Sequence, residues 1–211
     1  MRRPALIAQQ AGRPTGLLGR LLLKLMAHET RSFNREVLDV LAPADGERMV
    51  EVGFGHGSAL AEIAGASPRA ELAGIDVSDD AARVAARRCR VALAAGRLDL
   101  RVGDGADLPW PDATFDKAFA VHTVYFWSDP LRNLRELRRV LRPGGLLVLG
   151  LRERSPAAIA SFPPPTYHFY SDDELAAFLR TAGFGEVDVR MARSGAGDLR
   201  IVVSLAQSAH S

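Results

Sequence analysis

The sequence has a single cysteine, only two lysines and no hydrophobic run long enough to cross a membrane. Cys89 cannot form an intramolecular disulfide, and no set of metal ligands surrounds it in the sequence. A membrane-spanning helix needs about 18 or more consecutive apolar residues, so no stable membrane span is expected. Residues 1–16 are basic but lack the apolar core of a signal peptide. We therefore expect a cytoplasmic protein without a bound metal.

An excess of charge of one sign is also missing, because 27 Lys and Arg residues face 25 Asp and Glu residues. The basic residues are scattered among acidic ones, so the sequence does not indicate nucleic-acid binding. A chain of 211 residues with 47% hydrophobic and 25% charged residues is typical of one globular domain.

Short strand-like runs alternate with longer helix-like patterns, which is typical of an α/β sheet built from parallel βαβ units. The expected strands are 48–52, 70–76, 98–103, 117–121 and 145–151. The helices expected between them are 57–66, 79–95 and 129–141.

The alternation stops after residue 151. Residues 152–170 carry four prolines and end in a cluster of aromatic residues, which predicts a long surface loop. A helix then begins with Ser171 and Glu174 spaced as a capping box and ends before Gly183. Two final strands, near 185–192 and 199–206, indicate an antiparallel hairpin.

Residues 49–64, MVEVGFGHGSALAEIA, pass from an apolar strand through three closely spaced glycines into a helical pattern. Gly53, Gly55 and Gly57 would let the backbone approach a ligand, and the helix N-terminus offers N–H groups without helical partners. The spacing G-x-G-x-G differs from the dinucleotide fingerprint G-x-G-x-x-G, because Ser58 holds the position of its third glycine. A pyrophosphate is therefore the less natural ligand, and a tight packing turn remains the alternative.

Two aspartates follow the next two expected strands, at the same edge of the sheet as the glycines. Asp76 could accept hydrogen bonds from both hydroxyls of a ribose, although it could instead cap a helix, for which Ser78 is also available. Asp104 could meet an exocyclic amine while the backbone of Gly105 and Ala106 flanks the ring, although a turn aspartate is the plainer interpretation.

Taken together, these segments resemble the class I S-adenosylmethionine-dependent methyltransferases, in particular their small-molecule branch. VEVGFGHG is similar to the first motif of that family, GIDVS to its ribose-binding strand end, and GDGADLPWPDATFDKAF to its adenine-side segment. LRELRRVLRPGGLLVL is similar to its passage from the fourth helix to the fifth strand. The resemblance implies a Rossmann-like sheet of seven strands in the order 3-2-1-4-5-7-6, with the last strand antiparallel and helices on both faces.

The resemblance also implies that S-adenosylmethionine is the cofactor. The residues that it assigns to cofactor binding are Glu51, Gly53, Gly55, Gly57, Asp76, Val77, Ser78, Asp104, Gly105 and Ala106. Phe54 and His56 depart from the family pattern, in which small or hydroxyl residues are frequent in the glycine loop. His122 stands where related sequences often carry asparagine.

The activity implied is methyl transfer to oxygen, nitrogen or activated carbon of a small molecule by in-line displacement. His122 and Tyr125 follow the fourth strand and are candidate catalytic residues, although a packing role is the alternative. A non-catalytic S-adenosylmethionine-binding module is a second hypothesis. A nicotinamide-dependent oxidoreductase is a third, which the glycine spacing weakens.

Three regions are expected within the single domain. Residues 1–44 would form an N-terminal helical cap, in which the amphipathic pattern at 17–26 packs over the cofactor mouth. A helix lying on a membrane surface is the alternative for this pattern. Residues 45–151 would form the cofactor-binding core, and 152–211 a lid loop, helix and closing hairpin. Tyr167, His168 and Tyr170 lie in the loop expected to cover the acceptor.

Overall fold

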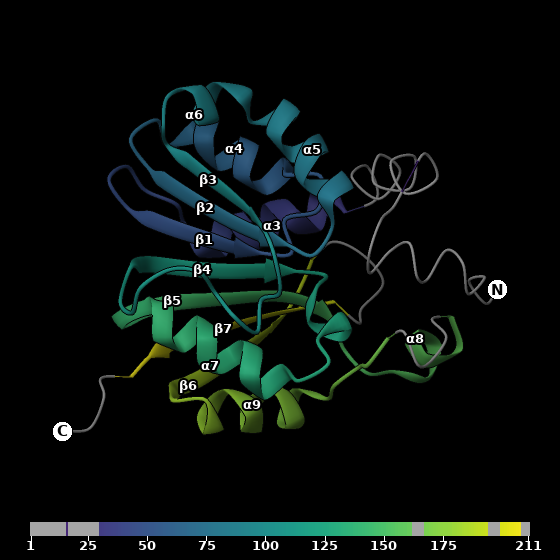
Figure 1. The fold of residues 1–211 in the computed structure, drawn as a ribbon. Coiled ribbons are helices and arrows are strands. Elements are labelled where there is room, and N and C mark those ends of the chain that lie inside the picture. Colours follow the sequence, from purple (N-terminus) through teal and green to yellow (C-terminus); the bar gives the residue numbers. More distant parts are fainter. Residues whose placement is uncertain (1–15, 17–29, 162–166, 194–198, 208–211) are drawn as a thin grey trace.

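A seven-stranded sheet with the order β3-β2-β1-β4-β5-β7-β6 forms the centre of the molecule (Figure 1). The computed structural model describes Gly16 and residues 30–161, 167–193 and 199–207. Strands β1 to β5 run parallel, whereas β7 is antiparallel to both β5 and β6. The expected order and the antiparallel last strand are therefore confirmed. The strands are β1 (Arg48–Val52), β2 (Glu71–Asp76), β3 (Leu98–Val102), β4 (Phe115–Val121), β5 (Leu141–Arg152), β6 (Phe184–Met191) and β7 (Leu199–Ala206).

Helices cover both faces of this sheet, with α7 and α9 on the side opposite α4, α5 and α6 (Figure 1). Ala118 and Phe119 are neighbours on β4 and both are fully buried, but they belong to different hydrophobic clusters, because successive strand side chains point to opposite faces. The helices are α3 (Arg31–Leu41), α4 (Ser58–Ala66), α5 (Asp79–Arg88), α6 (Arg90–Ala94), the 3₁₀ turn η1 (Val124–Phe126), α7 (Pro130–Val140), α8 (Pro156–Ser161) and α9 (Asp172–Thr181).

Helix starts lie where the sequence places capping residues. The Asp129 side chain accepts from the N–H of Arg132 at 3.0 Å, and Pro130 opens α7. Ser171 and Glu174 form the predicted capping box at the start of α9. These local contacts satisfy N–H groups that would otherwise lack partners, and they fix where each helix begins.

Two expected elements differ in the structure. The helix predicted over 79–95 is interrupted at Cys89, which separates α5 from α6. The surface loop predicted over 152–170 contains α8, which begins after Ser155, whose Oγ accepts from Ala158 N–H at 3.1 Å. At the end of that loop Tyr167 is buried, with its ring 4.8 Å from that of Phe126. Aromatic burial therefore draws this segment into the core.

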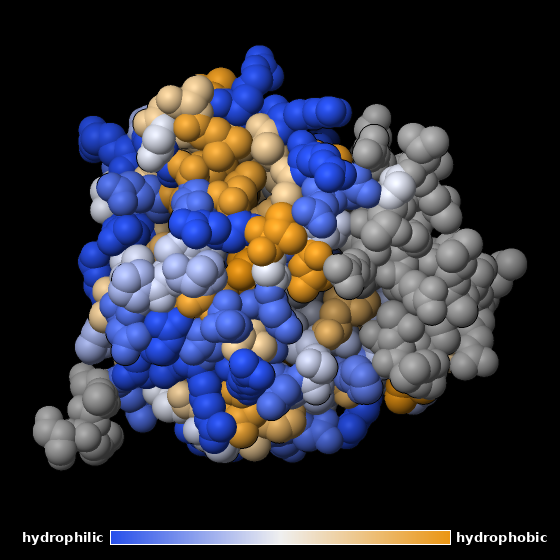
Figure 2. Space-filling model, viewed as in Figure 1, coloured by the Kyte–Doolittle hydropathy of each residue, from blue (hydrophilic) through white to orange (hydrophobic). Residues whose placement is uncertain are grey.

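The surface in the view of Figure 1 is mainly hydrophilic, with hydrophobic residues gathered near α4 and α6 and at the centre of the view (Figure 2). No helix among the described residues is long and apolar enough to cross a membrane. The amphipathic pattern expected at 17–26 lies outside the described residues.

Candidate functional site

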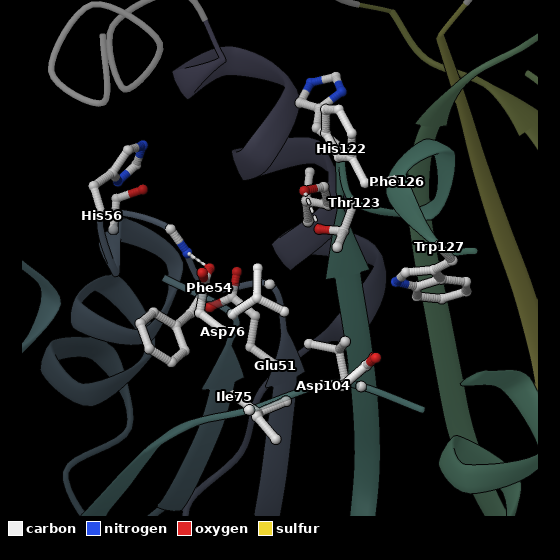
Figure 3. Close-up of a pocket in the computed structure, with 18 of the residues that line it drawn as sticks. Glu51, Phe54, His56, Ile75, Asp76, Asp104, His122, Thr123, Phe126 and Trp127 are labelled. Carbon is white, nitrogen blue, oxygen red and sulfur yellow. Dashed lines mark hydrogen bonds between the residues drawn. The ribbon is translucent and has the colours of Figure 1, made fainter. Parts of the chain in front are cut away.

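A cavity of about 220 Å³ lies at the carboxyl ends of the central strands, where the chain order reverses between β1 and β4 (Figure 3). Open α/β sheets bind ligands at such switch points. Most of the residues singled out in the sequence line this cavity: Glu51, Gly53, Gly55, Asp76, Val77, Asp104, Gly105 and His122. The fold therefore brings together residues that lie far apart in the sequence. Glu51 and His122, for example, are separated by 71 positions.

The glycine loop leaves β1 with backbone angles that suit glycine. Gly53 has a φ of 77°, and a Cβ on this residue would lie 2.4 Å from Thr123 Cγ2. Its N–H donates to the Ile75 carbonyl at 2.7 Å, which ties the loop to the end of β2. A side chain at Gly53 would therefore displace Thr123, which itself lines the cavity.

Asp76 organises the loop rather than capping a helix. Its Oδ2 accepts from the N–H of Gly55 at 2.8 Å, and its Oδ1 accepts from the N–H of Ser78 at 2.9 Å. Ser78 caps α5 by accepting from Ala81 N–H, so the helix-cap alternative for Asp76 is wrong. Burial raises the pKa of Asp76, and the two backbone donors oppose that rise. Each carboxylate oxygen still has a lone pair for a ligand hydroxyl.

Glu51 lies at the base of the cavity with 4% of its surface exposed. Its pKa is raised well above the usual value, first by burial and then by the charge of Asp76 (Figure 3). Its Oε2 has no hydrogen-bond partner among the described residues. Buried oxygens are nearly always hydrogen-bonded, so this one indicates a site for a ligand donor.

Asp104 turns the backbone at the far end of the cavity by accepting from Ala106 N–H at 2.9 Å. Gly105 packs so closely that a Cβ would lie 2.6 Å from Val52 Cγ1. The Ala106 side chain does not line the cavity, and neither does Gly57, where a Cβ would lie 2.7 Å from that of Ala85. Gly57 therefore serves the packing of α4 on α5, and Ser78 serves the start of α5.

His122 stands at the opposite side of the cavity from His56 (Figure 3). It has a φ of 56°, which is unusual outside glycine. Its ring packs 4.9 Å from the ring of Phe33, and its Nδ1 lies 2.5 Å from Tyr125 Oη. Burial, followed by the charge of Arg152, lowers the pKa of His122 to about 4. The imidazole is therefore neutral at pH 7.

Tyr125 lies behind His122, buried and outside the cavity lining. Its backbone carbonyl accepts from His168 N–H at 2.9 Å. Tyr125 therefore orients His122 and anchors the segment around Tyr167 rather than facing the cavity itself.

His56 has a defined tautomer. Arg88 Nη1 lies 2.8 Å from His56 Nδ1, and because guanidinium only donates, Nδ1 accepts and Nε2 carries the proton. Burial and then Arg88 lower the pKa of His56 to about 4. This departure from the family pattern places a neutral N–H donor on the glycine loop.

Several lining residues were missed by the sequence analysis. Among them are Thr30 and Asn34 from the start of α3 and Thr123, Phe126, Trp127 and Ser128 after β4. The aromatic pair lies within the segment AVHTVYFW, so its position after a strand end was a usable signal. Asn34 had no such signal, because α3 belongs to no βαβ unit. No group of three or more potential metal ligands occurs within the described residues.

Comparison with known proteins gives consistent results. The protein family described as "Methyltransferase domain" matches residues 50–149. The chain is 35% identical to O-methyltransferase cnsE of Penicillium expansum, over 74% of this chain and 59% of that protein. It is 30% identical to O-methyltransferase rstn1 of Aspergillus nomiae, over 80% of this chain and 77% of that protein. The alignment with cnsE thus spans less than two thirds of the relative's length.

Solved structures share the fold. An S-adenosylmethionine-dependent methyltransferase from Aquifex aeolicus superposes with a TM-score of 0.71 at 24% identity, covering 87% of this chain and 96% of that one.

Proposed function

We propose that this chain, which belongs to the class I S-adenosylmethionine-dependent methyltransferase family, transfers a methyl group from that cofactor to a small-molecule acceptor. The observation that carries the proposal is a single cavity that joins the glycine loop, Asp76 and Asp104 on one side to His122 on the other. A cofactor half and an acceptor half therefore meet in one space.

The cavity residues fit the cofactor. Asp76 has free lone pairs for the ribose hydroxyls, and Asp104 has them for the amine of the adenine. The Oε2 of Glu51, which has no hydrogen-bond partner among the described residues, fits a positively charged amino group. The loop at Gly53 and Gly55 provides a backbone surface without side chains against the remainder of the ligand.

When bound, S-adenosylmethionine supplies a methyl group on a positively charged sulfur, which activates the methyl toward attack. Held by Glu51, Asp76 and Asp104, it would supply the methyl group to the acceptor and would keep the electron pair of the broken carbon–sulfur bond on sulfur. The protein's part is mainly to align the two reactants and exclude water.

The acceptor half combines the neutral His122 with the rings of Phe126 and Trp127. The aromatic rings provide apolar surface for a flat or apolar molecule. His122 is available to take the proton of an acceptor hydroxyl, with Tyr125 holding its ring in place. A hydroxyl acceptor is favoured over an amine or carbon because the relatives cnsE and rstn1 are named as O-methyltransferases.

The first prediction concerns the ligand. Calorimetry on the purified chain should show binding of S-adenosylhomocysteine and no binding of NADH, because the cavity lacks the third glycine of a pyrophosphate loop. Labelled S-adenosylmethionine incubated with panels of phenols, quinols, amines and carboxylates should then give a methylated product.

Two results would contradict this assignment. Tight NADH binding without S-adenosylhomocysteine binding would favour an oxidoreductase. Binding of S-adenosylhomocysteine without product from any acceptor in the panels would favour a non-catalytic module.

A further inference from the structure

Two buried side-chain oxygens lack hydrogen-bond partners among the described residues, and both belong to residues that line the same cavity. They are Oε2 of Glu51, at the end of β1, and Oδ1 of Asn34, on α3. Each such oxygen costs stability unless a donor meets it. Two of them beside one cavity point to a ligand group that carries several N–H donors.

We infer that Asn34 is a cofactor-binding residue, which together with Glu51 accepts hydrogen bonds from the α-ammonium group of S-adenosylmethionine. The inference rests on the proposed function, since it assigns a residue to the same cofactor. Asn34 lies outside residues 50–149, which the methyltransferase family matches.

The position of Asn34 indicates which donor group of the cofactor it would bind, namely the ammonium. Phe33, its neighbour on α3, packs 4.9 Å from His122, so Asn34 reaches the cavity from the side where β4 ends. Asp104 stands at the other end, which suits the adenine amine, and Asp76 suits the ribose hydroxyls. The ammonium is the remaining donor group of the cofactor.

The chemistry of the pair agrees with this assignment. A carboxylate and a neutral amide oxygen attract a cation, whereas they would repel the carboxylate at the same end of the cofactor. Asn34 adds an acceptor without placing a third carboxyl beside Glu51 and Asp76, where burial and the Asp76 charge already raise the pKa of Glu51. An amide at this position is thus better suited than another acid.

The test compares ligands that differ in the amino group. Dissociation constants would be measured by calorimetry on the full chain for S-adenosylhomocysteine, its deaminated analogue and 5′-methylthioadenosine. Asn34→Leu, which keeps the size and removes the acceptor, should weaken S-adenosylhomocysteine about tenfold or more, as expected for a hydrogen bond to a charged group. It should leave the other two ligands unchanged.

The variants include matched controls. Asp39→Leu places the same side chain at an exposed position of α3 and should bind all three ligands as the wild type does. Asn34→Ala, which removes the acceptor without added bulk, should reproduce Asn34→Leu. Equal weakening of all three ligands by both Asn34 variants, or no weakening, would overturn the inference. Failure of the wild type to bind S-adenosylhomocysteine would instead overturn the proposed function.

Discussion

Glu51 illustrates how a binding site costs stability before its ligand arrives. Because the folded-state pKa of Glu51 is raised, the stability that it contributes is present at low pH and is lost as pH rises above the unfolded value of about 4.3. Burial and the neighbouring Asp76 cause that loss, which a cationic ligand would offset.

The variant Glu51→Gln should therefore be more stable than the wild type when ligand-free at neutral pH. A gain of about 1 kcal/mol corresponds to about 2–4 °C in melting temperature for a chain of this size. The gain should shrink toward pH 4, where the wild-type carboxyl is protonated, while affinity for S-adenosylhomocysteine should fall. Glu62→Gln is the control, because Glu62 on α4 is 45% exposed and its ion pair with Arg35 is at the surface. A wild type that melts higher than Glu51→Gln at neutral pH would contradict the argument.

His122 shows a second effect of burial. Its pKa is lowered to about 4, so the imidazole is neutral near pH 7. His122→Asn should lower kcat about 10²-fold, the scale of positioned general-base catalysis, with unchanged S-adenosylhomocysteine affinity. Tyr125→Phe should lower kcat less, since it removes only the contact that orients the ring. Asp39→Asn, at an exposed position of α3, is the control.

The pH profile tests the lowered pKa of His122, and the His122→Asn variant tests its role in catalysis. At saturating cofactor, kcat of the wild type should stay level as pH falls from about 7 to 5, because His122 gains its proton only near pH 4. A decline in kcat centred near 6.5 would contradict the lowered pKa of His122, whereas His122→Asn with wild-type kcat would exclude His122 as the base.

Among the elements, the strands could be predicted best from the sequence. Parallel strands buried on both faces have near-continuous apolar runs, and β1 occupies the predicted residues 48–52. Site residues at strand ends could also be predicted, because the carboxyl ends of parallel strands lie at one edge of the sheet. Glu51, Asp76 and Asp104 thus reach one cavity from three strands.

The helices show where sequence patterns fall short. The periodicity of 79–95 continues through Cys89, but the backbone of Cys89, with φ −95° and ψ 19°, is not helical and separates α5 from α6. In α8, Ser155 and Pro156 form a regular helix start that the neighbouring prolines obscured in the sequence. Asn34 is a further case: its place in the cavity depends on how α3 packs on β4 and β5, which no local pattern encodes.

Across the molecule, two segments outside the sheet lie on or near the cavity at the end of β4. From the N-terminal side, α3 contributes Thr30 and Asn34 to the lining. From the C-terminal side, Tyr167 packs against Phe126, which lines the cavity, and Arg154 N–H donates to the Tyr170 carbonyl at 3.0 Å. The short connections within the sheet are too small to enclose an acceptor, so these segments are the candidates for a cover.

We expect residues 153–170 and the segment before Arg31 to become protected from hydrogen exchange when S-adenosylhomocysteine and an acceptor bind together. That segment, apart from Gly16 and Thr30, and residues 162–166 lie outside the described part of the chain. Within the cover, the His168 amide should gain little protection, because it already donates to the Tyr125 carbonyl, and the gain is expected in residues 153–161. Amides of α7, which is on the face opposite α4, should exchange equally with and without ligands. Equal exchange of 153–161 in both states would mean that this segment is surface structure, and the water-excluding wall would have to come from residues after β4.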